Sequence, residues 1–229
     1  MQKKLCVLFL VGCFMASVLP MQAWSSPHKS QKAVIKKLIM ILQHSAKADT
    51  KGDDYYTLAS LRTQILLNDL LSTVDNANNK KLNRLVKNYV SDMALLQDEA
   101  QINPQCLFYL GSALSGISSW INTFSAGGIA ACLIADLVAD VGNILSALQS
   151  YRICEIVYSE TPDQALCQQI VKRQTLVKTC SYIAKVITVY YCTSIPSASD
   201  YLSLVLGLWG VFPRNDVCVP PAAESKNGL

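Results

Sequence analysis

The sequence has few of the residues and motifs on which most enzymes depend. Only two histidines occur, His28 and His44, both in the basic amino-terminal part. The chain contains no G-x-S-x-G, phosphate-binding loop, dinucleotide fingerprint, H-E-x-x-H or C-x-x-C, so it offers no nucleophile elbow, nucleotide site, zinc site or thioredoxin-like redox pair. Aromatic residues are not interleaved with basic ones, as stacking platforms for nucleic acid would be. We therefore expect a non-enzymatic protein that uses no cofactor or metal and binds no nucleic acid.

Charge is missing from the middle of the chain. No lysine or arginine occurs between Lys87 and Arg152, and residues 106–135 carry no charge of either sign. That stretch exceeds the roughly 20 apolar residues that cross a bilayer, although serine, threonine and asparagine dilute it. Residues 107–148 are therefore interpreted either as part of a protein core or as an apolar hairpin that inserts into a membrane.

The first residues have the pattern of an export signal. Lys3 and Lys4 precede an apolar run over residues 5–19, and the small residues Ala23 and Ser25 suit cleavage nearby. We expect residues 1–25 to be a secretory signal peptide and the mature protein to be secreted or periplasmic. Two alternatives stay open, namely an uncleaved membrane anchor and a lipoprotein acylated at Cys13, which ends a lipobox-like sequence.

Hydrophobic periodicity predicts helices through the rest of the chain, and hence an all-α fold of about seven helices. We expect an amphipathic three-helix segment at 26–103, an apolar cysteine-rich helical domain at 104–213 and a mobile tail at 214–229. The first helix, 31–46, carries lysines on one face, which is interpreted as solvated or as a contact for anionic lipid or an acidic partner. The clearest apolar stripe consists of Leu82, Leu85, Val86, Tyr89, Met93 and Leu96.

The cysteines predict a disulfide framework around one helical hairpin. After removal of the leader, seven of the nine cysteines remain, which in an oxidising compartment suggests up to three bridges and one odd thiol. Two long helical segments flank a turn at 159–162 and predict an antiparallel hairpin over about 126–192. In an antiparallel hairpin, two residues that lie opposite each other on the two helices have residue numbers whose sum is nearly constant along the hairpin. This rule predicts the bridges Cys154–Cys167 and Cys132–Cys192, and leaves Cys180, on another face, to pair with Cys106 or Cys218.

A narrow polar stripe follows the first helix of that hairpin. It contains Asp136, Asp140 and Asn143, with Cys132 one turn before. The two aspartates are four residues apart and therefore adjacent on a helix surface. Without histidine partners, a solvent-facing acidic stripe is the simplest interpretation. A cation or substrate pathway in a membrane bundle and an enzyme that uses both aspartates are the alternatives.

These patterns together predict an exported, non-enzymatic helical protein that binds or scaffolds an unknown protein partner and is stabilised by disulfides. The alternative is a membrane-active or membrane-embedded protein that inserts the hairpin at 107–148, with the lysine-rich first helix as its surface contact.

Overall fold

The fold is all-α, as the sequence predicts. A computed structural model describes residues 27–47, 54–76, 78–99, 102–111 and 130–192, together with 202, 204, 205, 207, 208, 211 and 215–218; the side chains of 27–30, 99, 130, 131, 191, 192, 215 and 216 are not described. The elements are α2 (Pro27–Lys47), α3 (Tyr55–Thr73), α4 (Asn79–Glu99), the 3₁₀ helix η1 (Pro104–Cys106), α6 (Ala130–Val157), α7 (Gln164–Cys192) and the 3₁₀ helix η2 (Asn215–Cys218).

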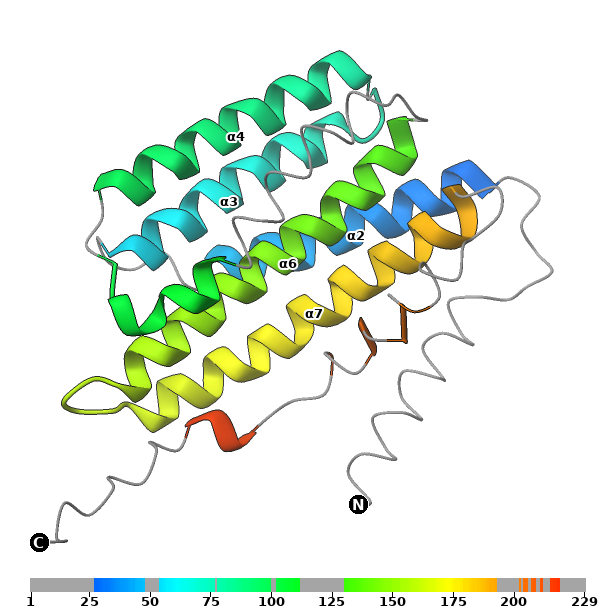
Figure 1. Cartoon of the computed structure of the whole chain (residues 1–229). Helices are drawn as coiled ribbons and strands as arrows, with labels where there is room; N and C mark the ends of the chain where they lie inside the picture. Colours follow the sequence, from blue (N-terminus) through cyan, green and yellow to red (C-terminus); the bar gives the residue numbers. More distant parts are fainter. Residues whose placement is uncertain are drawn as a thin grey trace, which may run out of the picture.

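The long helices lie roughly side by side, with α4 at one edge of the molecule (Figure 1). Next to α4 comes α3, followed by α6 and α7, while α2 lies behind α6 and contacts α3, α6 and α7. The main neighbour of α4 is α3. Helix α4 therefore keeps a long outer face.

One apolar core runs through all five long helices. It includes fully buried residues of each, for example Leu42 of α2, Leu67 of α3, Val86 of α4, Leu145 of α6 and Val177 of α7. The predicted stripe on α4 points into this core, with Leu82, Val86, Tyr89, Met93 and Leu96 buried and Leu85 partly buried. Described residues of both parts distinguished by composition, 26–103 and 104–213, thus contribute to this core.

Aspartate or asparagine side chains begin three of the helices. Asp54 accepts from the backbone N–H of Thr57 at 2.8 Å, Asn78 from that of Lys81 at 2.8 Å, and Asp163 from that of Leu166 at 2.9 Å. Such N-caps satisfy amide groups that have no partner inside the helix. The negative charges of Asp54 and Asp163 also suit the positive end of the helix dipole.

Helices α6 and α7 form the predicted antiparallel hairpin. Polar contacts between them join Asp136 to Lys185, Asn143 to Ser181, and the backbone of Ser146 to Gln174. Residue numbers rise along α6 as they fall along α7. This is the register that the cysteine spacing predicts.

The described disulfides connect the hairpin to flanking segments rather than to itself. Cys106 is bonded to Cys154, and Cys167 to Cys218, each with a Cα–Cα distance of 5.8 Å. The predicted bridge between Cys154 and Cys167 is therefore wrong. So is the expectation that Cys180 pairs with Cys106 or Cys218, since Cys180 is a free and buried thiol.

The prediction failed because two cysteines at the same level along the hairpin need not point toward each other. Cys154 packs in the main core, whereas Cys167 packs in a separate small cluster with Ile153, Ile170 and Cys218. Cys132 is also disulfide-bonded. The side chain of Cys192, its predicted partner, lies outside the described residues.

Several other predictions also fall partly or wholly outside the described residues. The leader at 1–25 does so completely. Of the helix expected to follow Pro104, η1 and residues 107–111 are helical, and the remainder lies outside. In the tail expected to be mobile from residue 214, η2 is tied to α7 by the bridge of Cys218, so this part of the tail is anchored.

Candidate functional site

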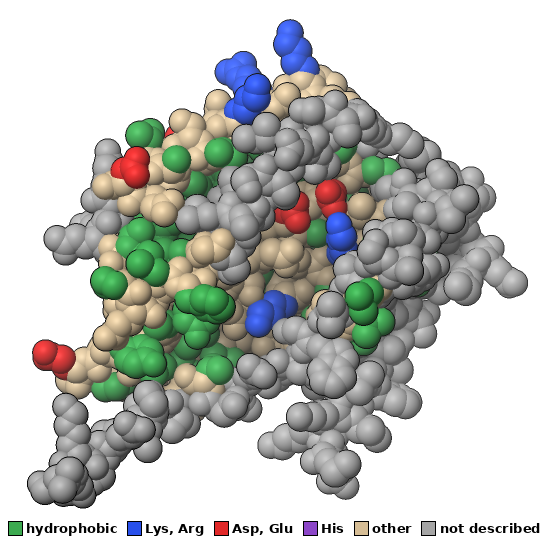
Figure 2. All heavy atoms as spheres, in the orientation of Figure 1, with side chains coloured by type: hydrophobic (Ala, Val, Ile, Leu, Met, Phe, Trp, Pro, Cys, Tyr) green, Lys and Arg blue, Asp and Glu red, His purple; other side chains and the backbone are tan. Residues whose placement is uncertain are grey.

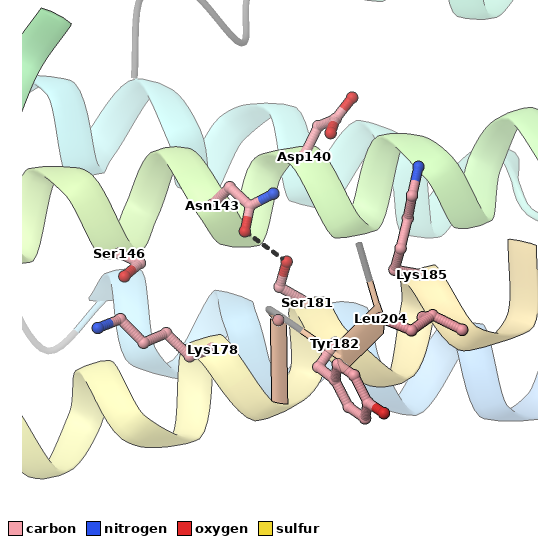
Figure 3. Close-up of a pocket in the computed structure, with 9 residues that line it drawn as sticks. Asp140, Asn143, Ser146, Lys178, Ser181, Tyr182, Lys185 and Leu204 are labelled. Carbon is pink, nitrogen blue, oxygen red and sulfur yellow. Dashed lines mark hydrogen bonds between the residues drawn. The ribbon is translucent and has the colours of Figure 1, made fainter. Parts of the chain in front are cut away.

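An open groove lies between α6, α7 and the segment that contains Leu204 and Gly207. Its volume is about 400 Å³. We call it the α6–α7 groove, and Figure 3 shows the side chains around it. Its lining residues come mostly from the two facing helices: Asp140, Asn143, Ser146, Lys178, Ser181, Tyr182, Lys185, Leu204 and Gly207.

Close packing of the two helices forms the base of the groove. The buried Ser181 hydroxyl lies 2.6 Å from the backbone oxygen of Ala139, to which it donates, and 2.8 Å from the side-chain oxygen of Asn143 (Figure 3). Gly142 makes this approach feasible, because a Cβ atom there would lie 2.8 Å from the Cβ of Ser181. The lack of a side chain at Gly142 therefore allows α6 and α7 to pack closely at the base of the α6–α7 groove.

Charges of both signs line the groove or its edge. The Lys185 ammonium lies 3.0 Å from a carboxylate oxygen of Asp136, in a pair whose side chains are 41% and 23% exposed. Asp140 and Lys178 contribute a further carboxylate and ammonium. The described lining of the groove therefore carries charges of both signs.

The structure places the predicted polar stripe against α7. Asp140 and Asn143 line the groove, and Asp136 is paired with Lys185. Asn143 is exposed and the two aspartates are partly exposed, so the stripe reaches solvent while Asp136 is also paired across the hairpin. Lys178, Ser181 and Lys185 were missed. The antiparallel register would have found Lys185, because it lies at the height of Asp136.

The arrangement suits binding better than nucleophilic catalysis. Ser181 and Lys185 are four residues apart on α7 and so share a face, which raises the question of whether the lysine could act as a base for the serine. However, the Ser181 hydroxyl donates to the backbone of Ala139, and the Lys185 ammonium is already paired with the Asp136 carboxylate. An activated serine requires a free proton acceptor at its oxygen. Among the described residues, no group of three or more His, Cys, Asp or Glu side chains could hold a metal ion.

A second polar cluster holds the segment before η1 against α6. The Tyr151 hydroxyl accepts from the backbone N–H of Asn103 at 3.1 Å, and Arg152 lies 3.1 Å from carboxylates of both Asp54 and Glu155. Burial raises the pKa of Tyr151 to about 12. These groups satisfy one another, so we assign this cluster to stability rather than to ligand binding.

The free thiol is also unsuited to chemistry. Cys180 is 2% exposed and belongs to the main core. Burial raises its pKa to about 12, and a thiol rather than a thiolate is a poor nucleophile.

Replacing Asp136 with Asn should have a small effect on stability. The pair with Lys185 is partly exposed, and ion pairs of that kind contribute about 0.2–1 kcal/mol. We expect the free energy of unfolding, measured by urea denaturation, to fall by no more than about 1 kcal/mol. Asp98→Asn, at an exposed position of α4, is the control. A much larger loss would mean that Asp136 has a structural role beyond this pair.

In comparisons with known proteins, no protein-family model, no curated protein and no solved structure matches the chain.

Proposed function

We propose that the protein is an exported, non-enzymatic binding or scaffold protein. The observation that carries this proposal is the pair of disulfides, which join residues 48 and 51 positions apart and fix flanking segments to the helical hairpin. Structural disulfides of this kind persist in oxidising compartments and are rare in reducing ones. The leader-like first 25 residues agree with export.

The α6–α7 groove is the candidate binding site. Its volume of about 400 Å³ falls in the range of small-ligand pockets, about 300–1,000 Å³. It presents amide, hydroxyl, carboxylate and ammonium groups without an activated nucleophile. A small polar molecule, or a polar side chain of a protein partner, is the occupant that this lining fits.

A peptide map of the protein from its exporting cells tests the proposal. Free thiols are blocked at lysis, and the digest is analysed without reduction. We expect linked peptides for Cys106–Cys154 and Cys167–Cys218, and recovery of the mature chain in the soluble fraction. Blocked thiols at these four positions would rule out an oxidised framework and with it the exported compartment.

One observation favours the membrane-active alternative. Residues Cys132–Val157 of α6 are long and apolar enough to cross a membrane, and they form the one candidate span among the described residues. However, 72% of the apolar window is buried inside the bundle, so α6 would have to leave the core in order to insert. This alternative predicts dye release from anionic liposomes and recovery of the chain in carbonate-resistant membranes. No release at either acidic or neutral pH would exclude it.

A further inference from the structure

A strongly basic surface lies on the first half of α4. It consists of Lys80, Lys81, Arg84 and Lys87, all exposed, and we call it the α4 basic surface. In the sequence, no acidic residue occurs between Asp75 and Asp92. Within the part of the chain that the structure describes, none of the four forms an ion pair. Figure 2 shows lysine and arginine side chains projecting from the edge of the molecule that α4 occupies.

The charges of α4 are placed so that they destabilise the helix. Lys80 and Lys81 lie in the first turn of α4, at the positive end of its dipole, and Asp98 and Glu99 lie in the last turn, at the negative end. Charges placed this way destabilise a helix, whereas the reverse order would stabilise it. Helix stability therefore does not account for the basic cluster.

Lysines of α2 neutralise the nearest acid in sequence. Lys36 lies 2.7 Å from the Asp75 carboxylate, and the Lys32 ammonium donates to the Asp75 backbone oxygen at 3.3 Å. Asp75 precedes α4 by only a few residues, so this contact brings the lysine-rich part of α2 to the same end of the bundle. The positive potential of the α4 basic surface is thus reinforced rather than compensated.

We propose that the α4 basic surface docks the protein on an anionic phospholipid bilayer. The four cations stand on the outer face of an edge helix, which suits an extended negative surface better than a small anion that needs enclosing donors. Clusters of four to eight lysines and arginines on a helix are typical of anionic lipid recognition. A second copy of the chain that packs α4 against α4 is a poor occupant, because the four cations of each helix would face an α4 whose one described exposed acid is Asp98.

Co-sedimentation with lipid vesicles tests this proposal. The mature chain is mixed with phosphatidylcholine vesicles that contain or lack phosphatidylglycerol, at low and at physiological salt. We expect binding to the anionic vesicles only, weakened by salt. Each basic residue near an anionic membrane contributes roughly fivefold in partitioning. Lys80→Gln/Arg84→Gln should therefore bind about 25-fold more weakly, as should Lys81→Gln/Lys87→Gln.

A control with the same net charge separates local docking from general attraction. Lys47→Gln/Lys172→Gln removes two cations from the end of α2 and from α7, and should bind nearly as the parent does. Equal losses in this control and in the α4 variants would overturn the proposal. So would equal binding to neutral vesicles, competition by inorganic phosphate at the headgroup concentration, or a dimer in analytical ultracentrifugation that the α4 variants abolish. Circular dichroism checks that each variant is folded.

Discussion

Replacing both Cys106 and Cys154 with serine should lower the free energy of unfolding by about 4 kcal/mol. The bridge closes a loop between residues 48 positions apart, and the entropy that a cross-link removes from the unfolded chain grows with the length of that loop. Both sulfur-bearing residues are buried, at 0% and 6% exposure. Urea denaturation under non-reducing conditions, which keeps the bridge Cys167–Cys218 intact, measures the loss.

The matched control is Cys180→Ser. It changes a buried cysteine that forms no bridge, and should therefore lose far less stability. The variant Cys154→Ser/Cys167→Ser discriminates between the two pairings. Under the pairing predicted from sequence this variant would lose one bridge. In the structure it loses two, Cys106–Cys154 and Cys167–Cys218, and should therefore be the least stable of the three variants. If Cys106→Ser/Cys154→Ser unfolds at the same urea concentration as the parent, the observed pairing is contradicted.

The difference between predicted and observed bridges shows which part of the fold is encoded locally. Helical periodicity and a constant sum of residue numbers predict α6, α7 and their antiparallel register from neighbours along the chain. The partner of Cys154 depends instead on where the segment after Asn103 docks. That docking depends on the Tyr151 hydroxyl and on the main apolar core, in which Cys106 and Leu110 are buried, and no local pattern specifies either contact.

The candidate groove was likewise only half predictable. The acidic stripe of α6 is visible in the sequence because its residues are one helical turn apart. Its partners on α7 follow only after the two helices are placed in register, and the contribution of Leu204 and Gly207 follows only from the tertiary structure. The basic surfaces show the same limit. Lys32 and Lys36 resemble a free basic face until the fold brings Asp75 to them, which leaves α4 as the better candidate for lipid contact.

Gly142 is the residue at which the spacing of the groove can be tested directly. In Gly142→Ala the new Cβ would lie 2.8 Å from the Cβ and 3.3 Å from the Cα of Ser181. Neither atom is the far end of a flexible side chain, so α6 and α7 must move apart. Overpacking of this kind costs about 1–3 kcal/mol. We expect a net loss of about 2 kcal/mol in the free energy of unfolding, together with a disturbed contact between Asn143 and Ser181.

A second glycine provides a matched control, at which the same substitution should raise the stability instead of lowering it. Gly111 is helical and exposed, and a Cβ there would meet no atom within 4 Å. Alanine is favoured over glycine in a helix by about 1 kcal/mol, so Gly111→Ala should be slightly stabilised, and the two variants should differ by about 3 kcal/mol. Adding Ser181→Gly to Gly142→Ala removes the colliding Cβ, and the double variant should lose less than the sum of its two single changes. Strict additivity, or a Gly142→Ala protein as stable as Gly111→Ala, would show that the helices do not approach this closely at Gly142 and Ser181.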